Sequence, residues 1–137
     1  MKISLIYFDF PFWRAEVARL SLFIGNIEFE DVRITSDEFQ RVKSDGQLDN
    51  GIKIPFNQLP CLVVDKVSIA QTAGIARFCG KLANLYPEDN NLKAAKIDQF
   101  IDIITDLTEL ISSTKVENRE NLAIGELARK LTILNKS

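Results

Sequence analysis

Histidine is absent from this sequence of 137 residues. Its absence excludes histidine acid–base catalysis, Ser-His and Cys-His nucleophile systems and most zinc sites. An enzyme built on this chain would have to work with tyrosine, carboxylates, lysine, arginine, hydroxyls, cysteine or backbone groups.

Cysteine is scarce, since only Cys61 and Cys79 occur. They form no CxxC motif and have no metal-ligand spacing, so the sequence predicts no metal site. We interpret both as small buried hydrophobic residues. A redox role for Cys61 stays open as an alternative.

Long hydrophobic runs and an excess of one charge are also missing. No apolar stretch approaches the ~20 residues of a membrane span, and Asp9 and Arg14 interrupt the N-terminal apolar run too early for a signal peptide. The formal net charge is −2, which provides no basic surface for nucleic acid. We therefore expect a cytoplasmic protein with neither a membrane nor a nucleic acid as partner.

The first third of the chain predicts a strand, a helix and a second strand. Residues 2–8 are apolar with period two, residues 14–24 have apolar positions at helical spacing before Gly25-Asn26, and residues 27–34 form the next apolar run. A strand–helix–strand unit of this length implies two parallel strands joined by a right-handed crossover.

The next structured stretch predicts a hairpin followed by a helix. Residues 61–64 and 67–69 are apolar strands around the turn Asp65-Lys66. A helix then opens at Gln71-Thr72, with Thr72 as the expected N-cap, and ends near Gly80. The order is βαβ followed by ββα.

Polar segments separate these units from each other and from a helical region. Residues 35–54 predict a loop with at most a short helix at 37–42, and a connection of this length is either functional or a variable surface loop. Amphipathic patterns predict helices at 92–112 and 118–136. The expected organisation is an α/β domain at 1–83, a linker at 84–91 and a partial all-α domain at 92–137.

Two features of residues 55–81 point to ligand binding. Pro60 lacks an N–H and holds Leu59 in an extended conformation, which leaves the Leu59 backbone available to an extended ligand. The start of the following helix offers free N–H groups and a partial positive charge to a carboxylate. Together they suggest a small, peptide-like, acidic ligand.

The stretch PFNQLPCLVVD…AQTAGIARF resembles the glutathione-binding half of the soluble, cytosolic glutathione transferases, whose pattern is close to PFGQLPVLEVDG…AQSxAIxRYL. The matching positions are Pro55, Phe56, Gln58, Leu59, Pro60, Leu62, Val64, Asp65, Ala70, Gln71, Ile75, Ala76, Arg77 and Phe78. The resemblance implies a thioredoxin-like N-terminal domain followed by an all-α domain. It also implies glutathione as substrate, a small electrophile as second substrate, a role in detoxification and a homodimer.

Tyr7 is the catalytic residue that the resemblance implies. Tyr7-Phe8-Asp9 resembles the YF(D/N) signature of the Tyr-type, sigma-like classes, in which this hydroxyl stabilises the glutathione thiolate. Serine-type classes place a serine in the following loop, and Phe10-Pro11-Phe12 provides none. Without the family resemblance, a tyrosine at this position of a strand is more often a core residue with a satisfied hydroxyl.

The resemblance also implies a set of glutathione contacts. Leu59 would pair through its backbone with the cysteinyl part, before a cis Pro60. Gln71 and Thr72 would hold the γ-glutamyl carboxylate, while Lys43 and Gln58 would face the glycyl end. Arg14, within the RAE motif, would support the site, and Phe39 stands where many members have tryptophan.

Asp98 begins a stripe of like charges with Asp102 and Asp106, spaced at i, i+4 and i+8. Such a stripe slightly disfavours a helix, and it is either a solvated acidic face or a functional one. The stripe resembles the family segment VDEIxDxxxDL, in which the position of Asp98 reaches the ligand amine in the partner subunit of a dimer.

The chain is shorter than full-length members, which continue with further helices. Ile97, Phe100, Ile104 and Leu107 would pack on those helices, so truncation or dimerisation must account for their apolar face. The leading hypothesis is a glutathione transferase acting on an electrophile. The alternatives are a non-catalytic binding or structural subunit of the same fold and a thiol oxidoreductase using Cys61.

Overall fold

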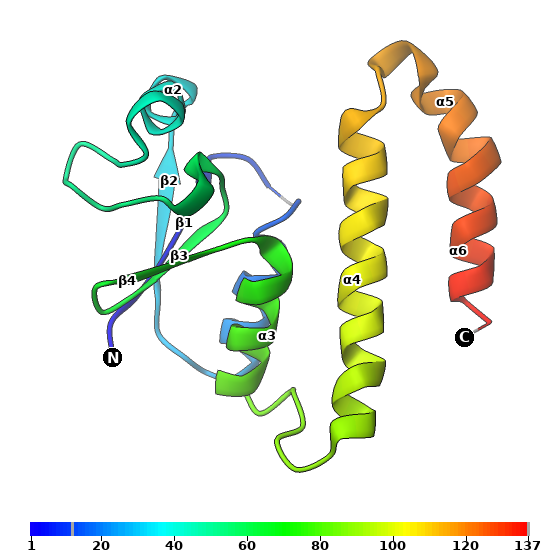
Figure 1. Ribbon diagram of the computed structural model, residues 1–137, viewed down its shortest axis with the longest axis horizontal. Helices are drawn as coiled ribbons and strands as arrows, with labels where there is room; N and C mark the ends of the chain where they lie inside the picture. The colour runs from blue at the N-terminus through cyan, green and yellow to red at the C-terminus, as the bar shows by residue number, and fades with distance from the viewer. Residues whose placement is uncertain (12, 137) are drawn as a thin grey trace. The chain divides into compact units, whose positions relative to one another are not determined.

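The computed structural model describes residues 1–11 and 13–136 (Figure 1). By its internal contacts the chain divides into two compact units, Met1–Asp98 and Gln99–Ser137. The predicted position of Phe12 in the loop after the first strand lies outside the described residues.

The first unit is built on a four-stranded mixed sheet. Its strands are β1 (Ile3–Phe8), β2 (Glu30–Ile34), β3 (Cys61–Val64) and β4 (Val67–Ala70), in the spatial order β2-β1-β3-β4. β1 runs parallel to β2 and antiparallel to β3. The predicted thioredoxin-like βαβ-ββα order is confirmed.

Helices cover both faces of this sheet. α1 (Glu16–Ile24) and α3 (Thr72–Leu82) pack against each other on one face, and α2 (Ser36–Asp45) lies on the other (Figure 1). Alternate residues of β1 pack on the two faces of the sheet, because successive side chains of a strand point to opposite faces. Leu5 and Tyr7 pack with α1 and α3, while Ile6 packs with Val42 of α2.

Helix α2 is longer than the short helix predicted at 37–42. A reciprocal capping box starts it: the Glu38 backbone N–H donates to Thr35 Oγ1 at 3.2 Å, and the Thr35 N–H donates to Glu38 Oε2 at 2.7 Å. Gly46, with a φ of 70°, ends it in the left-handed conformation. These groups satisfy backbone donors and acceptors that a helix leaves unpaired at its ends.

The predicted boundaries of three other elements are corrected. α1 begins at Glu16 rather than at residue 14, and β2 begins at Glu30 rather than at residue 27. The N-cap of α3 is Gln71, so the prediction of Thr72 is wrong, and this helix continues past Gly80 to Leu82.

The remaining chain is helical. α4 (Asn91–Ser113) is followed by a turn of 3₁₀-helix, η2 (Val116–Asn118), and then by α5 (Arg119–Leu122), η3 (Ala123–Leu127) and α6 (Ala128–Leu134). The last three form one helical stretch, interrupted by a π-helical turn at η3. In the second unit, Phe100 and Ile103 of α4 and Ile133 of α6 line a common hollow.

The end of α1 meets the end of α3 at Gly25. A Cβ built on Gly25 would lie 2.7 Å from Cβ and 2.8 Å from Cα of Ala83, which is buried. Gly74, inside α3, has no atom within 4 Å of the corresponding Cβ position. The two glycines therefore differ in the room that they leave for a methyl group.

We expect Gly25→Ala to lower the free energy of unfolding by about 1–3 kcal/mol, because the added methyl group overpacks the contact with Ala83. Gly74→Ala is the matched control and should raise it by up to about 1 kcal/mol, because alanine favours a helix over glycine. Urea denaturation of both variants measures the difference. Equal effects of the two substitutions would contradict the close approach at Gly25.

Candidate functional site

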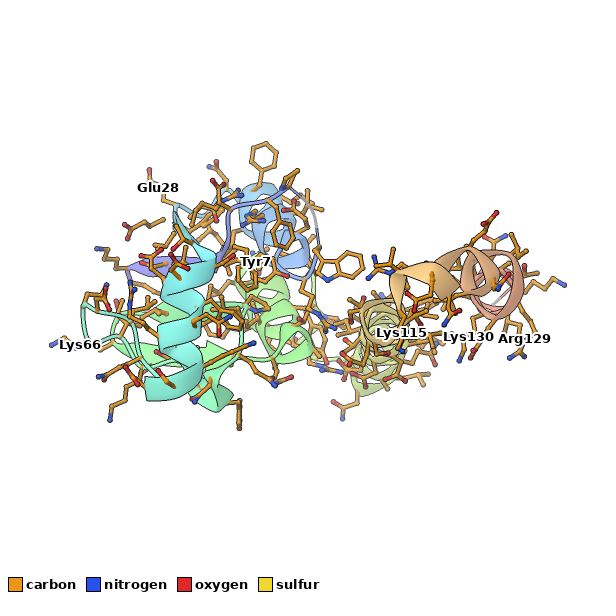
Figure 2. All side chains as sticks on the ribbon, turned by 90° about the horizontal axis from the view of Figure 1, so that it is seen from above. Tyr7, Glu28, Lys66, Lys115, Arg129 and Lys130 are labelled. Atoms are coloured by element: carbon orange, nitrogen blue, oxygen red, sulfur yellow. The ribbon has the colours of Figure 1, made fainter. Side chains whose placement is uncertain are left out.

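Tyr7 lies near the C-terminal end of β1 with 2% of its surface exposed. Figure 2 shows it in the interior of the first unit, whereas Glu28 and Lys66 lie at its periphery. Burial raises the pKa of Tyr7, and a hydrogen bond from the Arg14 backbone and the charges of Arg14 and Arg19 oppose that rise. The net effect is a raised pKa of Tyr7, so the phenol keeps its proton and is a hydrogen-bond donor at neutral pH.

Leu59 and Pro60 immediately precede β3 and are joined by a cis peptide bond. Ile6 of β1 pairs with Cys61 of β3, and continuing this antiparallel register brings Tyr7 level with Pro60. Among the described residues, the Leu59 N–H and C=O make no hydrogen bond to another backbone group. A backbone segment in which Leu59 pairs with no other described backbone group therefore lies beside the strand that carries Tyr7.

The start of α3 adds a second group of polar atoms. Gln71 has a φ of 73° and a ψ of 121°, and no side chain caps the helix there. A positive φ in a non-glycine residue is strained, and such strain concentrates at functional sites. Gln71 Nε2 donates to Gln58 Oε1 at 2.9 Å, so two predicted contacts that lie 13 residues apart meet beside an uncapped helix N-terminus. Thr72, the first residue of α3, is half-buried.

Phe39 and Lys43 sit one turn apart on α2. The Phe39 ring meets Phe8 edge-on at a centroid distance of 4.8 Å, and Phe8 in turn contacts Tyr7 at 5.3 Å. Lys43 Nζ lies 5.1 Å from the centre of the Phe39 ring, which is within the range of a cation–π interaction. Phe39 therefore joins an aromatic cluster with Phe8 and Tyr7, with a cation at its edge.

Asp98 is engaged within its own chain. Its Oδ1 accepts from Arg77 Nε at 2.6 Å and its Oδ2 accepts from the Tyr86 hydroxyl at 3.0 Å. The hydrogen bond from Arg77 is the largest influence holding the pKa of Asp98 below its ordinary value. The structure thus gives Asp98 a role in joining α3, the following loop and α4, and does not bring it together with the predicted contacts above.

Two hollows on the described surface are lined by other residues. One, of about 790 Å³, is lined by residues that include Phe23, Ile27 and Phe29. The other, of about 390 Å³, lies between α4 and α6. Neither is lined by a predicted site residue.

A group of charged residues beside Tyr7 was not predicted as part of the site. Arg19 of α1 and Arg33 of β2 both bind the carboxylate of Asp31, and Arg19 also contacts Glu16. The i, i+3 spacing of Glu16 and Arg19 was a readable signal. The contact of Arg19 with Asp31, which Arg33 also binds, joins α1 to β2, so it depends on the tertiary structure.

The described residues hold no metal-binding cluster and no membrane-spanning helix. No group of three or more acidic, histidine or cysteine side chains is placed to hold a metal ion in residues 1–11 and 13–136. Within the same residues no helix is long and apolar enough to cross a membrane.

The geometry defines a thioredoxin-like domain with a cis-proline strand beside a buried tyrosine. Residues 3–80 match the family profile described as "Glutathione S-transferase, N-terminal domain". That match covers more than half of the chain, which therefore belongs to the glutathione S-transferase family.

Individual relatives agree with this assignment. The chain is 33% identical over 91 residues to glutathione S-transferase 2 of Caenorhabditis elegans, covering 66% of this chain and 44% of the relative. It is 36% identical over 107 residues to glutathione S-transferase 2 of Onchocerca volvulus, covering 78% and 47%. The structure of the Ascaris lumbricoides glutathione S-transferase superposes with a TM-score of 0.78 at 25% identity, covering 99% of this chain and 67% of that one. The chain spans about half the length of the curated relatives it matches.

The two cysteines are buried and held as thiols. Burial raises the pKa of Cys79 to about 11, and it raises that of Cys61 to about 11 despite hydrogen bonds from Ser68 and Ile69. A thiol with such a pKa is almost entirely protonated at neutral pH, and the thiolate is the reactive form. This environment does not favour a redox role for Cys61.

We expect neither thiol of the native protein to react with a water-soluble disulfide reagent at pH 7.5. Roughly one thiol in three thousand is ionised at that pH, and both side chains are buried. In guanidinium chloride both should react at once. Rapid labelling of Cys61 in the native protein, identified with Cys79→Ala, would contradict the assignment.

Proposed function

We propose that this chain binds glutathione and uses Tyr7 to stabilise its thiolate for attack on a small electrophile. The observation that carries the proposal is the buried, protonated Tyr7 hydroxyl beside the free backbone of Leu59 and the cis Pro60. This arrangement also supports the finer assignment to a Tyr-type, sigma-like transferase.

Glutathione would bind as an added strand. The Leu59 N–H and C=O pair with the backbone of its cysteinyl residue, as in other cases of strand addition. Gln71, Thr72 and the N-terminus of α3 receive the γ-glutamyl carboxylate, since the first helical N–H groups and the helix dipole favour an anion. Gln58 and Lys43 face the glycyl end, where the ammonium group of Lys43 meets the second carboxylate.

The remaining predicted contacts act around this ligand. Arg14 supports the site through its backbone hydrogen bond and its charge at Tyr7. Phe39 provides an apolar wall without the N–H donor of a tryptophan. For Asp98 we keep the proposal of a contact across a dimer, although Arg77 and Tyr86 already occupy its carboxylate.

The chemical step needs a thiolate near neutral pH. A free cysteine thiol has a pKa near ~8.5, and a hydrogen bond donated to sulfur favours the charged form. The thiol proton passes to solvent and the sulfur lone pair forms the new S–C bond. With an activated aryl chloride, the C–Cl bond then breaks and chloride leaves with its electron pair.

A homodimer in the cytoplasm, active in detoxification, is the setting that we propose. Phe100 and Ile104 of α4 remain 40% and 47% exposed, and a second copy would cover such apolar surface. Sedimentation equilibrium that gives only the monomer mass at micromolar concentration would rule out the dimer. The division into a domain at 1–83, a linker at 84–91 and a helical domain at 92–137 is also our proposal.

Tyr7→Phe tests the catalytic assignment, and Tyr86→Phe is the matched control because these are the only two tyrosines. We expect Tyr7→Phe to bind glutathione with nearly unchanged affinity by calorimetry. Its conjugation of chlorodinitrobenzene at pH 6.5 should fall at least about tenfold, because each unit by which the thiol pKa rises lowers the thiolate fraction tenfold. Tyr86→Phe should retain both properties.

Three outcomes separate the hypotheses. Glutathione binding without turnover in the unmodified chain would favour the non-catalytic binding subunit. Full activity of Tyr7→Phe would contradict the role of Tyr7. Absence of glutathione binding would overturn the proposal as a whole.

A further inference from the structure

The turn that enters α1 contains a residue with positive φ, and no side chain caps the helix after it. Trp13 has a φ of 95°, a conformation that is strained for a bulky residue. The N-cap of α1 is Ala15, which offers no side-chain hydrogen bond, although helix starts are normally capped by one. Yet this turn carries the Arg14 backbone group that hydrogen-bonds Tyr7.

A carboxylate on the neighbouring strand provides a tertiary restraint. Asp31 Oδ1 accepts from Arg19 Nη2 at 3.1 Å and from Arg19 Nε at 3.2 Å. Asp31 Oδ2 accepts from Arg33 Nε at 2.8 Å and pairs with Arg33 Nη2 at 2.6 Å. The Arg19 and Asp31 side chains are 11% and 28% exposed, so water screens this pair less than a fully exposed one.

The two arginines extend this restraint to both ends of the β1–α1 connection. Arg19 contacts Glu16 in the first turn of α1. Arg33 Nη1 lies 3.4 Å from the Phe10 carbonyl oxygen and 3.6 Å from Asp9 Oδ1, just after β1. Phe10 itself packs edge-on against Tyr7 at a centroid distance of 5.5 Å.

The strand register explains why Asp31 can restrain the β1–α1 connection. Asp31 is the partner of Leu5, and Arg33 is the partner of Tyr7 in the parallel pair of β1 and β2. Residues two apart on a strand share a face, so Asp31 and Arg33 lie on the face of the sheet that carries Tyr7 and α1. The carboxylate thus lies beside the connection that it restrains.

We propose that Asp31 is a positioning residue that, through Arg19 and Arg33, holds the β1–α1 connection and thereby the surroundings of the Tyr7 hydroxyl. The restrained segment comprises residues 9–11 and 13–15. An effect of Asp31 on turnover depends on the proposed glutathione transferase function, whereas its effect on the order of this segment does not.

Trp13 provides a direct readout, since it is the only tryptophan in the sequence and lies within this connection. We expect Asp31→Asn to increase acrylamide quenching of Trp13 fluorescence about twofold at 25 °C, because a less restrained segment opens to solvent more often. The measurement is made without glutathione and well below the unfolding temperature. Under these conditions the loss of an ion pair that only adds global stability would leave the quenching of Trp13 unchanged.

Asp49→Asn is the matched control. Asp49 accepts from Arg41 Nε at 3.1 Å and from Arg41 Nη2 at 3.0 Å, so the substitution removes the same charge from a two-point arginine pair elsewhere on the domain. Trp13 quenching should remain at the level of the unmodified protein.

Arg33→Gln keeps the proposal testable if Asp31→Asn fails to fold. It removes the link to Phe10 and Asp9 while leaving the pair of Arg19 with Asp31, and a smaller increase in quenching is expected. If the folded Asp31→Asn and Arg33→Gln variants show the same acrylamide quenching of Trp13 as the unmodified protein, the proposal is overturned.

Calorimetry with glutathione separates this inference from the proposed function. If the unmodified protein does not bind glutathione, the proposed function fails and the quenching result still decides the role of Asp31. If it binds and turns over, Asp31→Asn should shift the pH of half-maximal turnover upward, while Asp49→Asn should not.

Discussion

The pairing of β1 with both of its neighbours is the constraint on which this structure depends. β1 lies between β2 and β3, and its alternate side chains enter the cores on the two faces of the sheet. A slip of one residue would move every side chain to the opposite face. The register that buries Leu5 and Ile6 therefore also brings Tyr7 level with Pro60, and a site between two strands follows from the packing of the core.

Two carboxylates restrain segments that are not held by strand pairing. Asp31 connects β2 with α1 through Arg19, and Asp98 connects α3 with the loop before α4 through Arg77 and Tyr86. In each case one carboxylate accepts from two donors on different segments. Removing such a carboxylate leaves its donors unsatisfied, which costs more than the loss of an isolated surface pair.

Local sequence was sufficient to predict the hairpin of β3 and β4, both helices on the α1 and α3 face, and α4. It predicted β2 but placed its start three residues too early, because the length of that strand depends on its partner. Ser4 pairs with Glu30, so Ile27 would stand opposite the first residue of the chain, where β1 has not begun. Ile27 and Phe29 are apolar because they pack on the core, not because they pair.

Other differences have equally specific causes. The polar composition of residues 35–54 predicted only a short helix at 37–42, whereas the capping box of Thr35 and Glu38 and the C-cap Gly46 extend α2 over Ser36–Asp45. β4 passes directly into α3 without a loop, so Gln71 takes the N-cap position with a positive φ and Thr72 becomes the first helical residue. The family motif identified Gln58 and Gln71 as site residues, whereas their contact with each other and the restraint through Asp31 require the tertiary structure.

The pKa of the bound glutathione thiol is the most direct test of the role of Tyr7. Difference ultraviolet absorbance of the thiolate, followed against pH in the complex, measures it in the unmodified protein and in Tyr7→Phe. We expect a pKa clearly below the free value of ~8.5 in the unmodified protein and a return toward that value in the variant. An unshifted thiol pKa in the unmodified complex would contradict this role of Tyr7.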